Sequence, residues 1–437
     1  MIDLQDQLFG MELEFTGITR KEAAAIISNH FGLSSSSIRI DSSTYNRHII
    51  RTPDGREWTV MKDASLNTSR TNSDSRSEYY SNSSSDYSCE FVTPKCKYSD
   101  LNDIQEIVRE FRHAGAKVNS SCGMHVHVDG SNHDVRSLIN LSKMMWARED
   151  ILYRAIDFKT PRLQWCAKTS QAYIERLDSR KPTTKDELKY CWYGDYGDHS
   201  GHYDSSRYRA LNLHAYFTKG TVEFRCFNST LHAGEVKSYI QFALGCSSRS
   251  INMTRTTLEK KTESTNECYT FRMFLIKIPL NGDEYKTCRY HMLKHLQGDK
   301  AWKNREEAMR RRAERAQFIR DQMDTLSEET GQQLTPERII AEPERENADL
   351  HMTARQQLIE LLEEMENDTS ITPDERTAIR LVLGFREGEN APSQAVTRSA
   401  NQGQTNNQPS VQQWLNNTTN SSQDITPFTP NQSRRSR

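Results

Sequence analysis

The sequence predicts an α+β protein with a mixed domain over residues 1–298, a helical region over 303–390 and a disordered tail over 391–437. Three observations support this division. Up to residue 298, short segments that alternate apolar and polar residues are interleaved with longer segments of helical periodicity. Beyond residue 303, apolar residues recur at every third or fourth position. The last 47 residues contain 32 Asn, Gln, Ser, Thr or Pro, a composition that cannot bury a core.

Four helices are expected in the mixed domain. Thr19-x-x-Glu22 is a capping box in front of an apolar run, so a helix should begin at Thr19. Further helices are expected over about 100–113, over about 133–156 and after Gly234. The strands between them should form the sheet of the domain.

Two further segments have a distinct character. Ser65–Ser88 contains ten serines in 24 residues and predicts a long loop inserted between two strands. In the helical region, Thr335-Pro336 and Thr372-Pro373 each combine an N-cap with a proline at the first helical position. An apolar stripe from Met309 to Leu326 predicts self-association through 303–330 or packing on the chain's own domain.

Composition excludes several classes of protein. Lys+Arg 58 against Asp+Glu 59 gives a net charge of −1, so a globally basic nucleic-acid-binding protein is not expected. No apolar run reaches the ~18–20 residues of a membrane span, so no membrane partner is expected. The nine cysteines are scattered without a C-x-x-C motif, which is typical of reduced thiols and predicts a cytoplasmic location.

Three short segments, 9–15, 124–129 and 221–226, share one design. Side chains alternate across a strand, so each segment has one apolar face and one polar face. The polar faces hold Glu12 and Glu14, then His125, His127 and Asp129, then Glu223 and Arg225. Each segment alone is typical of an amphipathic strand with its charges in water.

The three polar faces together indicate a metal site. None of them contains lysine, the commonest solvating residue, and all offer carboxylates, imidazoles or a guanidinium. If the strands share a sheet these groups converge, and like charges so close together require a cation among them. A carboxylate-rich set with one or two histidines and an arginine suits Mg²⁺ or Mn²⁺ with a phosphorylated substrate.

Four more residues are candidates. One strand-like segment ends at Asp63, and Glu90 lies in another. Each of these residues alone is typical of a surface acid. Arg209 and Asn212 precede the third strand, and Arg209 could bind a substrate carboxylate or form a surface ion pair. Thr218-Lys219-Gly220 predicts a hairpin turn before that strand.

These residues resemble a known family. Its motifs occur in order as Phe9-Gly10-Met11-Glu12-Leu13-Glu14-Phe15, Asp63-x-Ser65-Leu66, Glu90-x-x-Thr93-Pro94, Ser121-Cys122-Gly123-Met124-His125-Val126-His127-Val128, Arg209-x-x-Asn212-Leu213 and Thr221-Val222-Glu223-Phe224-Arg225. They resemble the amidoligase family, which is similar to the carboxylate–amine ligases of the glutamine synthetase and glutamate–cysteine ligase fold. The resemblance covers about residues 8–250.

The resemblance implies a fold and a set of residue roles. The fold would be a curved, mainly antiparallel sheet with helices outside it, holding ATP and Mg²⁺ or Mn²⁺ on one face. The implied metal ligands are Glu12, Glu14, Asp63, Glu90, His125 and Glu223. Arg225 and Glu223 would be catalytic, Arg225 and His127 would bind the cofactor, and Arg209 and Asn212 would bind substrate. The serine-rich insertion is longer than the family pattern, which leaves the position of Glu90 less secure.

The activity implied by the resemblance is ATP-dependent formation of an amide or peptide-like bond through an acyl phosphate. The partners would be a carboxylate and an amine, each an amino acid, a peptide or a protein. Two alternatives remain at this stage. His-x-His with carboxylates also suits a Zn²⁺ hydrolase of the amidohydrolase type. A non-enzymatic scaffold would use the helical region as its working part.

Overall fold

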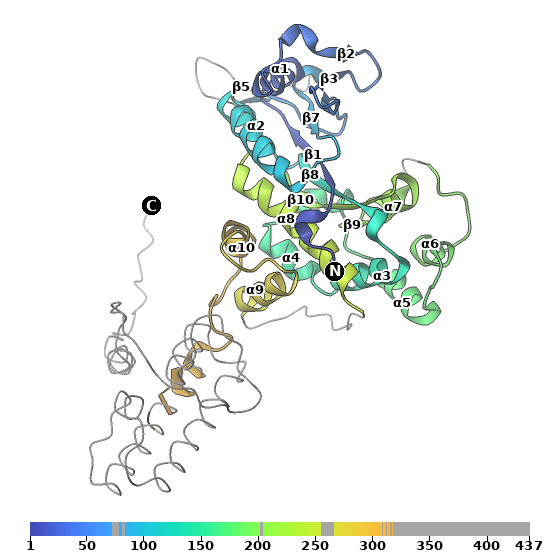
Figure 1. Ribbon diagram of the computed structural model, residues 1–437, viewed down its shortest axis with the longest axis vertical. Coiled ribbons are helices and arrows are strands. Elements are labelled where there is room, and N and C mark those ends of the chain that lie inside the picture. Colours follow the sequence, from blue (N-terminus) through green and yellow to red (C-terminus); the bar gives the residue numbers. More distant parts are fainter. Residues whose placement is uncertain are drawn as a thin grey trace, which may run out of the picture. The chain divides into compact units, whose positions relative to one another are not determined.

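The computed structural model describes residues 1–71, 78–80, 84–201, 204–254 and 266–307, and a few positions between 309 and 317. Met1–Lys303 form one compact unit, and Asn304–Arg437 are a separate unit of the chain (Figure 1). The described positions from 305 to 317 are helical. The rest of the predicted helical region, the predicted tail and part of the serine-rich insertion lie outside the described residues.

An antiparallel sheet is the centre of the first unit. Within the described residues it has eight strands in the order β2-β3-β4-β7-β1-β8-β10-β9, and every neighbouring pair is antiparallel. The strands are β1 (Phe9–Phe15), β2 (Arg39–Asp41), β3 (Arg47–Arg51), β4 (Glu57–Met61), β7 (Cys89–Val92), β8 (Gly123–Asp129), β9 (Leu211–Asn212) and β10 (Thr221–Asn228). A separate ribbon pairs β5 (Ser69–Thr71) with β6 (Glu78–Tyr80).

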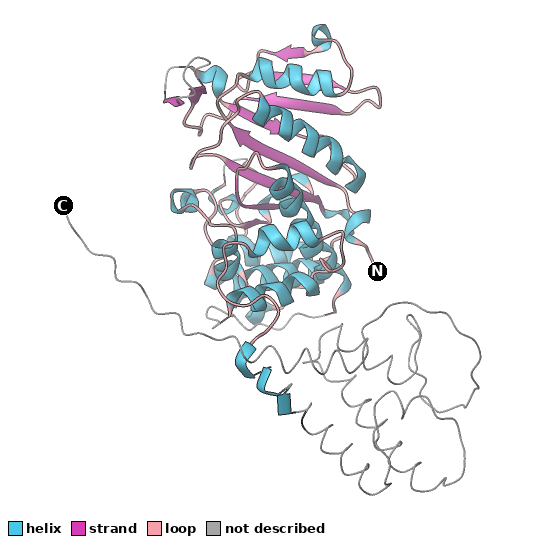
Figure 2. Ribbon diagram, turned by 90° about the vertical axis from the view of Figure 1, so that its left-hand side faces the viewer, coloured by secondary structure: helices cyan, strands magenta, loops and turns pink. Residues whose placement is uncertain are grey.

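Helices accompany the sheet along the chain. They are α1 (Arg20–His30), α2 (Leu101–His113), α3 (Val135–Trp146), α4 (Glu149–Ala155), α5 (Gln171–Arg180), α6 (Lys185–Tyr193), α7 (His214–Lys219), α8 (Ala233–Asn252), α9 (Glu267–Lys277) and α10 (Lys286–Leu293). Figure 2 shows the strands as a layer beside α-helices. The mixed α/β content and the antiparallel sheet confirm the α+β prediction.

The apolar sides of the central strands form the core. Phe15 and Phe91 of the sheet pack on Phe111 of α2, with ring centroids 4.8 and 5.4 Å apart. Phe227 of β10 stacks on Tyr239 of α8 at 4.5 Å. Burial of the apolar side chains stabilises the fold. Because side chains alternate along a strand, the polar residues between them must point to the opposite face of the sheet.

The helix predictions were correct in most cases. α1 begins after Thr19 with both hydrogen bonds of the capping box in place. The helix expected over 133–156 is two helices, α3 and α4, that are separated at Ala147 and Arg148. The periodic apolar pattern continues through this break without a proline or glycine, so the sequence has no signal for it.

The predicted hairpin turn at 218–220 is wrong. The connection between β9 and β10 is the short helix α7, and Gly220 ends it with φ +76° in the left-handed region. The carbonyl oxygen of the Asn212 side chain accepts a hydrogen bond from the main-chain N–H of Ala215 in the first turn. Gly220 is therefore a helix C-terminal glycine.

β10 contains a β-bulge beside the polar face. Phe224 pairs with Val126 and Phe227 pairs with Met124, so Arg225 and Cys226 together lie opposite the single residue His125. An extra residue in one strand changes the direction of the side chains that follow it. The bulge is why both Phe224 and Phe227 face the core.

A buried histidine predicts how the stability of this unit changes with pH. His133 is 7% exposed, and its ring nitrogens contact the hydroxyls of Ser137 (3.1 Å) and Ser247 (2.9 Å). Burial lowers the pKa of His133 to about 4. The unfolded chain therefore binds more protons than the folded chain between pH 6.5 and 4, and stability is lost as the pH falls through this window.

We expect His133→Gln to remove this titration. Between pH 7 and pH 5 the free energy of unfolding of the wild type should fall by about 2 kcal/mol more than that of the variant. Urea unfolding at both pH values measures the difference. An equal fall in the two proteins would contradict this role of His133.

Candidate active site

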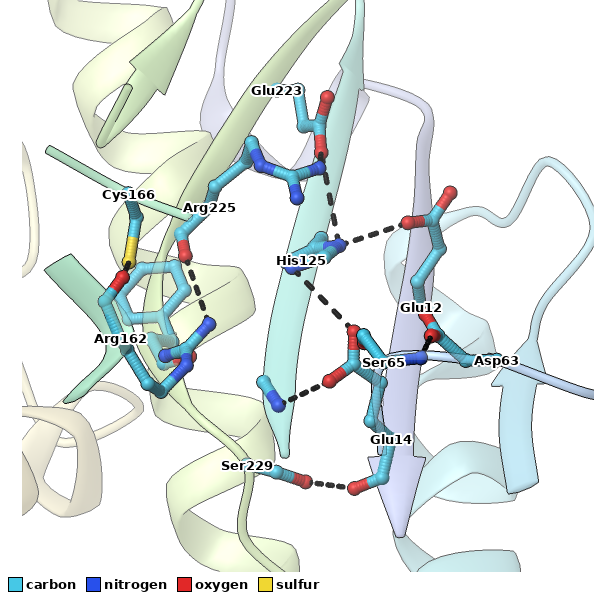
Figure 3. A network of polar contacts seen from close by, with 12 residues as sticks. Glu12, Glu14, Asp63, Ser65, His125, Arg162, Cys166, Glu223, Arg225 and Ser229 are labelled. Carbon is cyan, nitrogen blue, oxygen red and sulfur yellow. Dashed lines mark hydrogen bonds and ion pairs between the residues drawn. The ribbon is translucent and has the colours of Figure 1, made fainter. Parts of the chain in front are cut away.

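The register of the sheet brings the polar faces of β1, β7, β8 and β10 together. Glu12 pairs with His125 across β1 and β8, and Glu14 pairs with Glu90 across β1 and β7. On the other side of β8, His127 pairs with Glu223 of β10. Directly opposite residues point to the same face of a sheet, so these side chains converge. Figure 3 shows this for Glu12, Glu14, His125 and Glu223.

Among the described residues, two groups of side chains have the spacing of metal ligands. The first cluster is Glu12, His127 and Glu223, and the second cluster is Glu14, Asp63 and Glu90. Within each cluster, one ligand atom from each residue lies within 4.8 Å of the others. Glu12 and Glu14 are two residues apart on β1, so the clusters are neighbours along one strand.

Histidines and carboxylates contact one another in the first cluster. Nε2 of His127 lies 3.2 Å from Oε1 of Glu12 and 3.7 Å from Oε1 of Glu223. The other ring nitrogen of His127 contacts the hydroxyl of Thr221 at 3.0 Å. This contact fixes the ring, so that Nε2 faces the two carboxylates.

His125 lies between the two clusters. Its Nδ1 donates to Oε2 of Glu12 at 2.9 Å, and its Nε2 lies 3.9 Å from Oε1 of Glu14. The histidine is 5% exposed. It therefore contacts a carboxylate of each cluster.

Two side chains hold the carboxylate of Glu223. Asn212 of β9 donates through Nδ2 to Oε2 at 2.6 Å, and Arg225 donates through Nη1 to Oε1 at 2.5 Å. All three residues are buried. Nε of Arg225 is also buried and has no hydrogen-bond partner among the described residues. This arginine therefore keeps an unused donor at the site.

The second cluster is positioned through main-chain groups. The N–H of Gly123 donates to Oε2 of Glu14 at 2.6 Å. Asp63 follows β4, and its main-chain N–H donates to the hydroxyl of Ser88 at 3.0 Å. Ser88 immediately precedes β7, so this contact joins the two ends of the serine-rich insertion and brings Asp63 close to Glu90.

The first cluster has its negative charge balanced by cations. Burial alone would raise the pKa of Glu12, but the charge of nearby His127 and the hydrogen bond with His125 hold it well below its usual value. Burial also opposes ionisation of Glu223, and Arg225 and both histidines lower its pKa to about 2. These two carboxylates are therefore charged at neutral pH.

The pKa values of the two histidines are shifted in opposite directions. Burial would lower the pKa of His127, but Glu223 and Glu12 raise it above its usual value. Burial lowers the pKa of His125 to about 4, and the nearby Arg225 adds to the effect. His125 is therefore neutral near pH 7, the protonation state of a histidine that binds a metal.

In the second cluster, burial and like charge outweigh the effect of Arg162 and Arg225, which lower the pKa of Glu14. Burial raises the pKa of Glu14 to about 8, and the negative charge of Asp63 adds to the increase. Burial also raises the pKa of Glu90 well above its usual value, and Glu12, Glu14 and Asp63 act in the same direction. Without a cation this cluster retains protons at neutral pH.

The donor atoms fit hard divalent cations. Both clusters are rich in carboxylate oxygens, which Mg²⁺ and Mn²⁺ prefer, and the first adds an imidazole nitrogen. Nε2 of His127 is buried and forms no hydrogen bond of good geometry among the described residues. A cation bound by this nitrogen would displace its proton, whose loss Glu223 and Glu12 oppose by raising the pKa of His127.

A groove of about 230 Å³ adjoins the first cluster. Glu12 and His127 form its inner wall, and Gly10 and Thr221 also line it. Lys95 and Lys219 contribute two ammonium groups, and that of Lys95 pairs with Asp129 at 2.7 Å. Two acids, Glu12 and Asp129, line the groove as well, so it offers space and charges of both signs beside two candidate metal ligands.

The structure brings most of the predicted site residues onto one face. Converging there are Glu12, Glu14, Asp63, Glu90, His125, His127, Glu223, Arg225 and Asn212. Arg209 lies apart from this group in its contacts, and its guanidinium donates to the carbonyl of Lys168 at 3.2 Å. Asn212 contacts Glu223, so in this arrangement it orients a carboxylate.

Sequence reasoning missed three contributors to the site. Ser88 joins the ends of the insertion, Lys219 lines the groove, and Arg162 lies beneath Arg225 (Figure 3). The sequence pattern predicts a turn at Lys219, and a serine within a serine-rich segment carries no distinct signal. Arg162 lies far from the three strands in the sequence, so no local pattern connects it with them.

Comparisons with known proteins identify a family. A family model described as "Putative amidoligase enzyme" matches residues 5–247, which is more than half of the chain. No curated protein matches the chain. None of the described helices combines the length and apolar character that crossing a bilayer requires.

One solved structure is similar at a low level. It is the crystal structure of a bifunctional glutathione synthetase from Pasteurella multocida, with 11% identity and a TM-score of 0.31. The similarity covers 67% of this chain and 47% of that chain, so it spans about half the length of the synthetase. The family model, which matches the stretch that carries the site, confirms the resemblance seen in the motifs: the chain belongs to the amidoligase family.

Proposed function

We propose that the protein is an ATP- and Mg²⁺-dependent carboxylate–amine ligase. The observation that carries this proposal is the pair of adjacent carboxylate-rich clusters on one sheet face, with Arg225 beside them. Two close cation sites and a buried guanidinium are what a reaction on a polyphosphate requires. Membership of the amidoligase family supports a ligase-type reaction.

The chemistry needs an activated acid, because a free carboxylate resists attack by an amine in water. In the first step, a substrate carboxylate oxygen attacks the γ-phosphorus of ATP, and ADP leaves. In the second step, the amine nitrogen attacks the acyl carbon of the acyl phosphate, phosphate leaves, and the nitrogen loses a proton. Positioning and charge neutralisation are the main contributions that a protein makes to such phosphoryl transfer.

The chain supplies these contributions from named residues. Glu12, Glu223 and a histidine would hold one cation, and Glu14, Asp63 and Glu90 a second. Bound Mg²⁺ supplies positive charge against the phosphate oxygens. Nε of Arg225 is an unused donor at the same site. The guanidinium of Arg225 would offset negative charge that develops on the transferred phosphoryl group.

The groove beside the first cluster suits an anionic ligand. Lys95 and Lys219 line it, and so does His127, which pairs with Glu223 across β8 and β10. The phosphates of a nucleotide and the carboxylate of an acid substrate share the chemistry that this lining favours. Acids and amines from amino acids to proteins are therefore the substrates to examine.

Replacing a ligand of the first cluster should abolish turnover. We expect wild-type protein with Mg²⁺ to release ADP from ATP in the presence of a suitable acid and amine, in a screen across pairs of such compounds. Glu12→Gln and Glu223→Gln should each reduce the rate by roughly 10²-fold or more, because each removes one charged oxygen ligand. ADP release is measured in a coupled assay.

A matched control lies on the same face of the sheet, on another strand. Glu57 is an exposed residue of β4 that pairs with Arg39 at 3.6 Å, and Glu57→Gln should retain the wild-type rate. Full activity in both Glu12→Gln and Glu223→Gln would reject the metal assignment. Tightly bound Zn²⁺ with ATP-independent hydrolysis of amides would favour the amidohydrolase alternative instead.

Cation binding at the second cluster should depend on pH. The pKa of Glu14 is raised to about 8, so a cation must displace a proton that is still bound at pH 7. Affinity should therefore rise with pH from 6 to 8, by up to about tenfold per pH unit for each proton released. The Glu12→Gln variant isolates this cluster, and Mn²⁺ titration calorimetry in buffers of different ionisation enthalpy measures affinity and proton release together. An affinity that is constant over this pH range would show that Mn²⁺ displaces no proton there.

A further inference from the structure

The β-bulge in β10 leaves main-chain groups of this strand outside the regular pairing with β8. Arg225 and Cys226 share the position opposite His125, so the regular ladder between β10 and β8 is interrupted at the residue whose side chain holds Glu223. Main-chain groups that a bulge removes from the ladder need other partners when they are buried. The main-chain N–H of Arg225 is not among them, because it donates to the carbonyl of Ala210 at 2.8 Å and so continues the pairing of β10 with β9.

A buried arginine supplies the partners on the carbonyl side. Arg162 is 3% exposed and lies in the 3-10 turn Thr160–Gln164. Its Nη1 donates to the carbonyl of Phe227 in a short hydrogen bond, and its Nη2 lies 3.5 Å from the carbonyl of Arg225. One guanidinium therefore contacts the main chain on both sides of Cys226 (Figure 3).

The guanidinium also has no room to move toward β8. A Cβ atom on Gly123 would lie 2.2 Å from Nη2 of Arg162, so the end of this side chain rests against the main chain of β8. Gly123 is the residue whose N–H binds Glu14. Arg162 thus contacts the main chain of β10 and lies against Gly123 of β8.

We propose that Arg162 is a positioning residue for Arg225. By holding the carbonyls of Arg225 and Phe227, its guanidinium fixes the bulge that directs the Arg225 side chain toward Glu223. The role of Arg225 in turnover rests on the proposed function, whereas the effect of Arg162 on the bulge does not. The two parts can therefore be tested separately.

Turnover provides the first test. Arg162→Met should lower kcat for ADP release about 10²-fold, because small misplacements of a catalytic group have effects of this size, while KM for ATP changes by less than about threefold. In an Arg225→Met background, adding Arg162→Met should change kcat by less than about twofold, since Arg162 acts through Arg225. Losses that multiply would overturn the proposal.

Two further variants separate positioning from general damage. Arg176 is a matched control, because its guanidinium contacts two main-chain carbonyls, those of Cys191 (2.7 Å) and Trp192 (3.4 Å), away from the site. Arg176→Met should leave kcat unchanged. Gly123→Ala tests the same contact from the side of β8 and should also lower kcat, because a Cβ atom on Gly123 would lie 2.2 Å from Nη2 of Arg162 and 3.3 Å from Nε2 of His125.

Amide hydrogen exchange tests the bulge without any substrate. Arg162→Met should speed exchange of the amides of Arg225 and Phe227 at least tenfold, and Arg176→Met should not. Unchanged protection in Arg162→Met would overturn the positioning role even if the enzyme is active. Faster exchange at the bulge in a protein that never releases ADP would instead support the positioning role and reject the proposed function.

Discussion

Electrostatic repulsion among carboxylates is the constraint on which this structure depends. Five of them, Glu12, Glu14, Asp63, Glu90 and Glu223, are gathered on one face of a sheet. Arg225 and His127 balance the first cluster, and protonation relieves the second, as the pKa of about 8 for Glu14 indicates. A cationic ligand would relieve the repulsion that remains among these carboxylates.

The same strands that hold the acids also form the core. Met11 and Leu13 are buried toward the helices, whereas Glu12 between them faces the site. Each catalytic candidate is therefore fixed by apolar neighbours one residue away, on rigid strands rather than loops. Asp63 is the exception, since it follows β4 and is tied to Ser88 through its main chain. Its position thus depends on how the serine-rich insertion closes.

The local sequence predicts which side chains share a face of a strand, because this depends only on the alternation of residues along that strand. The shared face of Glu12 and Glu14 follows from alternation along one strand, and convergence with His125 follows once the strands are neighbours. Asp63 and Glu90 are weak candidates by local pattern, because each alone is typical of a surface acid, and it is the family resemblance that implies a role for them as metal ligands. The bulge in β10 and the partner that it finds in Arg162, 63 residues from Arg225, depend on tertiary contacts that no local pattern encodes.

The most direct test of the account locates the cations themselves. Crystals grown with Mn²⁺ and a non-hydrolysable ATP analogue should show two anomalous scattering peaks on this face, measured at the manganese absorption edge. One peak should lie among Glu12, His127 and Glu223, and the other among Glu14, Asp63 and Glu90, with the analogue's phosphates beside them. Bound analogue with no manganese at either cluster would contradict the account.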